Sequence, residues 1–256
     1  MTDAFFREWL DYFRWNAEEP DTFPWQSREA LAEGEAARLG KSIATFQLGE
    51  NSEGSALLKF AKRYGDEMGF ALLPSITALF VAEERNHSAL LARFMDKHGI
   101  PRRASDWTDA VFRRLRRPFG FEASLSVLIT AEIIALVYYR ALREATTSRL
   151  LRAICNKILE DEKSHVEYES ALIRFAQAGR GPSVRALWRL GHRLLFAGTS
   201  LVVYREHRAV LAGGGCPFRA FSRACRAEFL RLFPESAPQG TRRSGAKVAD
   251  MLWRKG

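Results

Sequence analysis

The feature that most constrains the fold is a pair of Glu-x-x-His tetrads, each placed on the apolar side of a predicted helix. The first runs from Glu84 to His87 and the second from Glu162 to His165. Residues three apart share one face of an α-helix, so each tetrad directs a carboxylate and an imidazole to the same side. A carboxylate that faces an apolar core is costly unless a cation meets it. The two helices are therefore expected to face each other around a common cationic centre.

Both tetrads lie within seams of large apolar residues that recur every three or four positions, the spacing of one helical face. A third acid, Glu132, interrupts a similar seam between them. Acids at core positions on successive helices are typical of a dinuclear metal site within a four-helix bundle. The seams contain Leu73, Ile76, Phe80, Leu91 and Phe94 around the first tetrad, Leu125, Ile129, Leu136 and Tyr139 around Glu132, and Leu151, Ile154, Ile158 and Leu172 around the second tetrad.

The same periodicity predicts an all-α protein. With 47% hydrophobic residues and only 9 prolines, the chain can build a sizeable helical core. Long helices are predicted over residues 28–66, 72–97, 120–145 and 148–178, and shorter ones over 3–15, 105–117, 184–212 and 217–232. We expect residues 1–26 to form an aromatic strap, 27–180 the four-helix bundle, 181–233 a helical extension of the same domain, and 234–256 a loose basic tail.

The stretch from Phe121 to Leu142 is long and apolar enough to cross a bilayer. Glu132 at its centre, with Glu122 and Arg140 at its ends, indicates instead a central helix buried on all sides. The N-terminus lacks the basic and then apolar order of a secretory signal. The three cysteines form no metal-type CxxC spacing, and their odd number does not suggest a disulfide framework, which favours reduced thiols. We therefore expect a cytoplasmic protein with no membrane span.

Positive charge is concentrated in the last quarter of the chain. Residues 180–256 contain 15 Lys/Arg and 4 Asp/Glu, a net charge of +11, whereas residues 1–179 have a net charge of −2 and the whole protein +9. Arg185, Arg189 and Arg193 recur every four residues, and a similar row on the next helix consists of Arg219, Arg223 and Arg226. Such a surface is either an ordinary solvated face or a docking site for an anionic partner, such as an acidic carrier protein, a phosphorylated substrate, a membrane surface or nucleic acid.

The first long helix offers two candidates for a fourth carboxylate. Glu50 and Glu53 lie on nearly the same face of the predicted helix, 34 and 31 residues before Glu84. Glu50 lies nearer the centre of the apolar face, so it is the preferred ligand and Glu53 the alternative. The other interpretation of the acids and histidines is a buried salt-bridge network without metal. Few Lys or Arg residues fall on the seams to neutralise the acids, which favours a metal centre.

Four carboxylates and two imidazoles suit iron or manganese better than zinc, which prefers fewer ligands in a tetrahedron. The pattern resembles that of the ferritin-like di-iron carboxylate superfamily, which includes bacterioferritins, rubrerythrins, ribonucleotide reductase small subunits and arylamine N-oxygenases. That pattern is one acid, a Glu-x-x-His, one Glu and a second Glu-x-x-His on four successive antiparallel helices. The resemblance covers about residues 40–178 and implies a metal ligand set of Glu50, Glu84, His87, Glu132, Glu162 and His165.

The resemblance implies two iron ions, or a manganese–iron pair, with dioxygen as co-substrate, an external electron donor and a redox partner that reduces the metals. The expected function is an oxidoreductase that hydroxylates, desaturates or N-oxygenates a small organic substrate. The alternatives are an iron-binding or iron-oxidising protein without an organic substrate, and a scaffold with structural metals. Absence of CxxC argues against a rubrerythrin-type peroxidase, and Ile158 replaces the extra histidine expected of a close arylamine N-oxygenase relative. A homodimer is compatible with this class.

The sequence also suggests roles for several other residues, most of them near the tetrads. Asp161 resembles the superfamily's acid that hydrogen-bonds a ligand histidine, here His87, and a solvated surface acid is the alternative. Glu169 is expected to be a surface acid near a helix end rather than an extra ligand or an acid in an entrance channel. Tyr138 and Tyr139 are expected to pack in the core rather than to contact a ligand. Two further histidines, His192 and His207, are expected to be structural or surface residues.

Overall fold

The computed structural model describes residues 1–20, 22–51, 54–107 and 120–234, and the regular structure within these ranges is entirely helical, as predicted. The predicted connecting helix over 105–117 and tail over 234–256 fall largely outside the described residues. The helices are α1 (Asp3–Glu18), α2 (Glu35–Glu50), α3 (Ser55–Met68), α4 (Leu73–Lys97), α6 (Phe121–Ala145), α7 (Arg149–Ala178), α8 (Pro182–Glu206), α9 (Arg208–Gly213) and α10 (Phe218–Leu232).

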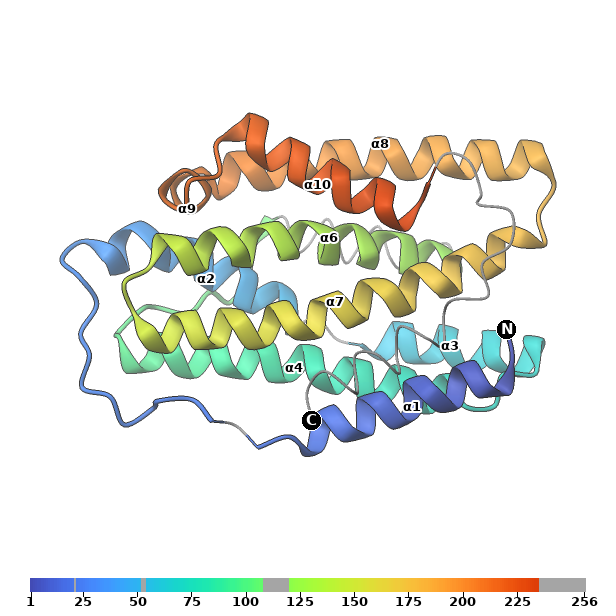
Figure 1. Cartoon of the computed structure of the whole chain (residues 1–256), viewed down its shortest axis with the longest axis horizontal. Coiled ribbons are helices and arrows are strands. Elements are labelled where there is room, and N and C mark those ends of the chain that lie inside the picture. The colour runs from blue at the N-terminus through green and yellow to red at the C-terminus, as the bar shows by residue number, and fades with distance from the viewer. Residues whose placement is uncertain (21, 52–53, 108–119, 235–256) are drawn as a thin grey trace.

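Helix α6 lies at the centre of the molecule. It packs against α7 on one side and against α8, α9 and α10 on the other, where these three helices form an outer layer (Figure 1). Helix α4 contacts α2, α3 and α7, and α1 lies along α4 at the opposite edge (Figure 1). Within the described residues, only α6 is long and apolar enough to cross a membrane, and 78% of its most apolar window is buried inside the protein.

The long helix predicted over residues 28–66 is wrong in its extent, because the chain forms two helices there. Helix α2 begins only at Glu35 and ends at Glu50, and α3 begins at Ser55. Gly54 directly precedes α3, and a Cβ atom at this position would clash with the side chain of Val81 on α4. The backbone passes close to α4 at this point, and only glycine fits. Glu50 therefore occupies the last turn of a helix.

The helix predicted over residues 184–212 is also divided. Helix α8 ends at Glu206, and α9 begins after His207. The ring Nδ1 of His207 lies 2.7 Å from the Ser42 hydroxyl of α2, so the residue at the break is fixed to a neighbouring helix. Burial lowers the pKa of His207 to about 4, so this histidine is neutral at physiological pH. His207 is thus structural, one of the two roles expected for it.

Helix α1 is the amphipathic aromatic helix that the sequence predicts. The Thr2 hydroxyl caps its first turn by accepting a hydrogen bond from the Phe5 amide. One face buries the rings of Phe6, Trp9 and Phe13, and the opposite face is exposed to solvent. The Phe13 ring stacks at 6.1 Å from the imidazole of His165 on α7. Helix α1 therefore reaches across the bundle to the second tetrad.

Candidate metal centre

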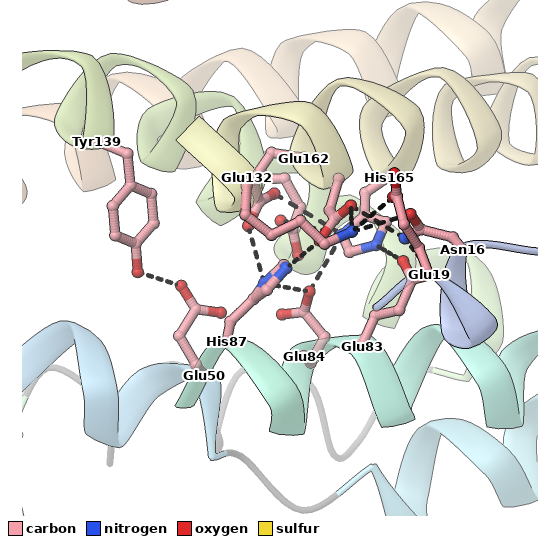
Figure 2. A network of polar contacts seen from close by, with 12 residues as sticks. Asn16, Glu19, Glu50, Glu83, Glu84, His87, Glu132, Tyr139, Glu162 and His165 are labelled. Atoms are coloured by element: carbon pink, nitrogen blue, oxygen red, sulfur yellow. Dashed lines mark hydrogen bonds and ion pairs between the residues drawn. The ribbon is translucent and has the colours of Figure 1, made fainter. Parts of the chain in front are cut away.

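Four helices bring the expected ligand residues to one point in the core (Figure 2). Helix α2 contributes its last residue, and α6 contributes an acid from the middle of its most apolar stretch. Helices α4 and α7 each contribute one Glu-x-x-His tetrad. The residues brought together are Glu50, Glu84, His87, Glu132, Glu162 and His165. Glu53, the alternative to Glu50, lies outside the described residues.

The ligand atoms form two overlapping groups that could each hold a metal ion. The first group consists of Glu50, Glu84, His87 and Glu162, and the second of Glu84, Glu132, Glu162 and His165. Within each group the ligand atoms lie within 4.8 Å of one another. Glu84 and Glu162 belong to both groups. Shared carboxylates between two adjacent metal positions are the arrangement of a bridged dinuclear centre.

The inward-facing atoms of this cluster lack protein partners that would satisfy them. The side chains of His87, His165 and Glu162 are completely buried. Within the described residues, the Nδ1 atom of His87 and both carboxylate oxygens of Glu162 have no hydrogen-bond partner. No Lys or Arg among those residues forms an ion pair with any of the four clustered glutamates. Their ion-pair partners are His87 and His165, and two imidazoles cannot balance four buried carboxylates, so this donor set fits bound cations.

Burial and mutual repulsion perturb the acids in the metal-free protein. Burial, followed by the charge of Glu84, raises the pKa of Glu50 to about 8. Burial and the neighbouring Glu132 raise the pKa of Glu162 well above its usual range. Burial lowers the pKa of His87, but the hydrogen bond to Asp161 and the charge of Glu84 outweigh it and raise the pKa to about 8. Without metal, the cluster therefore holds protons that a bound cation would displace.

An acid outside the cluster fixes each histidine. Asp161 lies 2.9 Å from Nε2 of His87, which is the hydrogen bond expected from the sequence. Asp161 is buried, so the alternative of a solvated surface acid is wrong. Glu83, which the sequence analysis missed, lies 2.8 Å from Nε2 of His165. Both acids directly precede the glutamate of a tetrad, and this repeated position is the signal that would have identified Glu83. With Nε2 engaged, each imidazole presents Nδ1 to the cluster.

Asn16 of α1 links the two outer acids, a contact that the sequence does not reveal. Its side-chain amide donates to Glu83 at 2.7 Å and to Asp161 at 2.9 Å (Figure 2). The Lys157 ammonium donates to the Asn16 carbonyl at 2.9 Å and to Asp161 at 2.8 Å. The lysine and the imidazole together lower the pKa of Asp161 despite its burial. Asp161 is therefore held charged, and contacts from α1 and α7 hold both outer acids in place.

We expect separate effects on metal affinity from neutralising the two outer acids. Asp161→Asn should weaken metal binding at the group that contains His87, and Glu83→Gln at the group that contains His165. The loss should be about 10- to 100-fold in each case, because an outer acid orients the imidazole and increases its basicity. Calorimetric titration with Mn²⁺ measures both affinities. Glu160→Gln, at an exposed position of α7, is the matched control. Unchanged affinities in both variants would contradict this role.

Two further expectations for residues near the cluster are wrong. Tyr139 does not only pack in the core: its hydroxyl donates to Glu50 at 2.6 Å (Figure 2). Tyr138 does pack in the core, stacked on Phe46, with its hydroxyl 2.9 Å from that of Ser42. Glu169 is not a surface acid, because only 1% of it is exposed. It lies well inside α7, which continues to Ala178.

A small cavity lies beside Phe80, and the centre of the Phe80 ring is 4.5 Å from that of the His165 imidazole. The cavity has room for about one water molecule. Its walls are mostly apolar, with the carboxyl group of Glu169 as an acidic element. The lining residues are Leu57, Thr77, Phe80, Phe121, Leu125, Tyr168, Glu169 and Leu172.

Comparison of the chain with models of known protein families, with curated proteins and with solved structures gives no significant match.

Proposed function

We propose that the chain is a ferritin-like oxidoreductase with a di-iron, or manganese–iron, centre that uses dioxygen to oxidise a small organic substrate. In this proposal α4, α6, α7 and the pair α2 and α3 are the four-helix bundle, α1 is the strap, and α8 to α10 are the added helices. The observation that carries the proposal is the pair of overlapping ligand groups that share Glu84 and Glu162. One shared pair of carboxylates between two histidine-containing groups supports a dinuclear centre.

The donor set supports iron or manganese as the metal. It contains four carboxylates and two imidazole nitrogens, and oxygen-rich sets with some imidazole favour these ions over zinc. Four negative charges balance two divalent cations, so the filled centre would be close to neutral within its apolar surroundings. Cysteine is absent from both groups.

The protein's own residues would orient this centre and keep it dry. Asp161 and Glu83 fix the two imidazoles, and Tyr139 holds the carboxylate of Glu50 by a hydrogen bond. Two bound ferrous ions would supply electrons to dioxygen. The buried aromatic rings of Phe13 and Phe80 beside His165 exclude bulk water from this side. An external electron donor would be needed to return the metals to their reduced state.

The alternative function is an iron-oxidising protein without an organic substrate. The small size of the cavity beside Phe80 favours it, since ligand pockets for organic molecules are typically about 300 Å³ or larger. The cavity suits a diatomic gas or water better than a drug-sized molecule. In the oxidoreductase proposal, an organic substrate that entered through this cavity would have to displace the side chains around it.

A dioxygen-uptake experiment separates the two functions. Protein loaded anaerobically with two ferrous ions per chain is mixed with oxygenated buffer, and oxygen consumption is followed with and without a panel of amines, phenols and fatty acids. An oxidoreductase should give an oxidised organic product that mass spectrometry detects with one ¹⁸O₂-derived atom or two hydrogens fewer. An iron-oxidising protein should instead oxidise many added ferrous ions per chain. Uptake no faster than that of Glu162→Gln would refute both functions.

A further inference from the structure

The outward face of α8 is an apolar ridge that no other described part of the chain covers. Its exposed side chains include the three leucines Leu187, Leu194 and Leu201, which are 72%, 65% and 58% exposed. Leu190 and Val184 are 56% and 52% exposed. Scattered single leucines on a surface are common, but five large apolar residues on one helix form a contiguous patch that indicates a contact surface.

The spacing shows that these residues share one face. The three leucines are seven residues apart, which is two helical turns, so they lie almost in line along α8. The opposite face carries the buried residues His192, Phe196 and Val203. The inward and outward faces of α8 are therefore both apolar. Packing onto the rest of the described chain accounts for the inward face only.

A row of arginines on α10 lies beside this ridge. Arg219, Arg223 and Arg226 are exposed and lie opposite the buried residues Phe221 and Cys225. Helices α8 and α10 contact each other and both pack on α6, forming the outer layer in Figure 1. Their outward faces consequently point away from α6 together. The leucines of α8 and these arginines of α10 form one surface, here called the α8–α10 surface.

Charge decides what kind of partner fits the α8–α10 surface. Residues 180–234 contain ten Arg and two Glu. Arg180 forms an ion pair with Glu122, and Arg231 forms one with Glu167. The row of arginines on α10 takes part in neither of these pairs. A second copy of the chain docking through this layer would bring two strongly positive surfaces together, which is unfavourable. An anionic lipid bilayer instead offers headgroups to the arginines and acyl chains to the leucines.

We propose that the α8–α10 surface docks the protein on anionic phospholipid membranes, with Leu187, Leu190, Leu194 and Leu201 inserted at the headgroup–acyl boundary. A helix that lies in the interface needs a long apolar face and nearby basic residues, and this surface has both. The docking is peripheral, since α6, the helix long enough to span a bilayer, is enclosed within the protein. It does not depend on metal, so its test is independent of the proposed oxidoreductase function.

The test is co-sedimentation of the full-length protein with vesicles. Vesicles of phosphatidylcholine with 30% phosphatidylglycerol should bind the protein, and pure phosphatidylcholine should bind it at least about tenfold more weakly. Leu187→Ser/Leu194→Ser and Arg219→Glu/Arg223→Glu/Arg226→Glu should each weaken binding about tenfold or more. Arg14→Glu/Lys59→Glu/Lys62→Glu, on α1 and α3 at the other edge, is the matched control and should bind like wild type. Circular dichroism checks that every variant remains folded.

Three results would overturn the proposal. The first is no binding to phosphatidylglycerol vesicles at low salt. The second is binding that the leucine variant leaves unchanged, because attraction through charge alone needs no apolar ridge. The third is a wild-type dimer, detected by light scattering, that Leu187→Ser/Leu194→Ser converts to monomer, because the ridge would then be covered by a second copy. The basic residues beyond 234 remain present in all variants, so a loss of binding reports on the α8–α10 surface.

Discussion

Replacing Glu162 with glutamine is expected to remove most of the bound metal and, at the same time, to stabilise the metal-free protein. Glu162 belongs to both ligand groups, so its loss affects both metal positions. In the metal-free state this completely buried carboxyl group has no hydrogen-bond donor among the described residues. A neutral amide of the same size can donate to Glu132 or Glu84. Removing an unsatisfied buried acid is worth about 1–3 kcal/mol, or roughly 3–10 °C in Tm.

The two effects are measured by elemental analysis and by thermal melting at pH 8 in the presence of a chelator. We expect metal content to fall from two ions per chain to below one. Glu50→Gln and Glu132→Gln, each in one group only, should retain about one ion. Glu160→Gln should match wild type in both measurements. Full metal content in Glu162→Gln, or a lower Tm of its metal-free form, would contradict the shared role of Glu162.

Loading with metal is expected to stabilise the protein strongly. Ligand at about a thousandfold above its Kd contributes roughly 4 kcal/mol per site, so two sites should raise Tm by about 15 °C or more. The measurement is a pair of melting curves, one with anaerobic ferrous iron or Mn²⁺ and one with chelator. Identical curves would favour the alternative interpretation of the cluster, a salt-bridge network without metal.

The size of this stabilisation should depend on pH in a known direction. The pKa of Glu50 is about 8 in the folded metal-free protein against 4.5 when unfolded, so the native state holds a proton that the unfolded state releases. The pKa of His87 is raised in the same sense, from 6.5 to about 8. Metal-free stability should therefore fall as pH rises from about 5 to 8. The lowered pKa of Asp161 has the opposite sign but acts below 3.8. Metal displaces these protons, so the Tm difference should widen with pH.

Periodic apolar residues were sufficient to predict most helices. The helix predicted over residues 72–97 is observed as Leu73–Lys97, and that over 148–178 as Arg149–Ala178. The interruption after Glu50 was not predicted by this periodicity, nor was the close approach of Gly54 to Val81 on another helix. The local sequence shows the spacing of apolar residues along a helix. A contact between distant segments leaves no periodic pattern in the sequence.

The candidate site likewise contains some residues that the local sequence predicts and others that only the folded structure reveals. The residues that face the centre were predictable from a Glu-x-x-His tetrad within an apolar seam. Asn16 was not, because a single asparagine on an amphipathic helix has no distinguishing pattern and its partners lie 67 and 145 residues away. Tyr139 was assigned to the core, since an apolar seam does not reveal which hydroxyl reaches an acid. Glu83 was overlooked, although it has the same position relative to its tetrad as Asp161.

The bridging position of Asn16 also has a consequence for the order of events during synthesis. Helix α1 is made first, but the Asp161 side chain that it contacts is 145 residues later in the chain. At about 5–20 residues per second, that acid follows Asn16 by roughly 7 to 30 s. Throughout this interval Trp9 and Phe13 lack the α7 rings of His165 and Tyr168 that they contact in the folded protein. Helix α1 can pack against α4 as soon as that helix has been made, but Asn16 links the two outer acids only after α7 has followed.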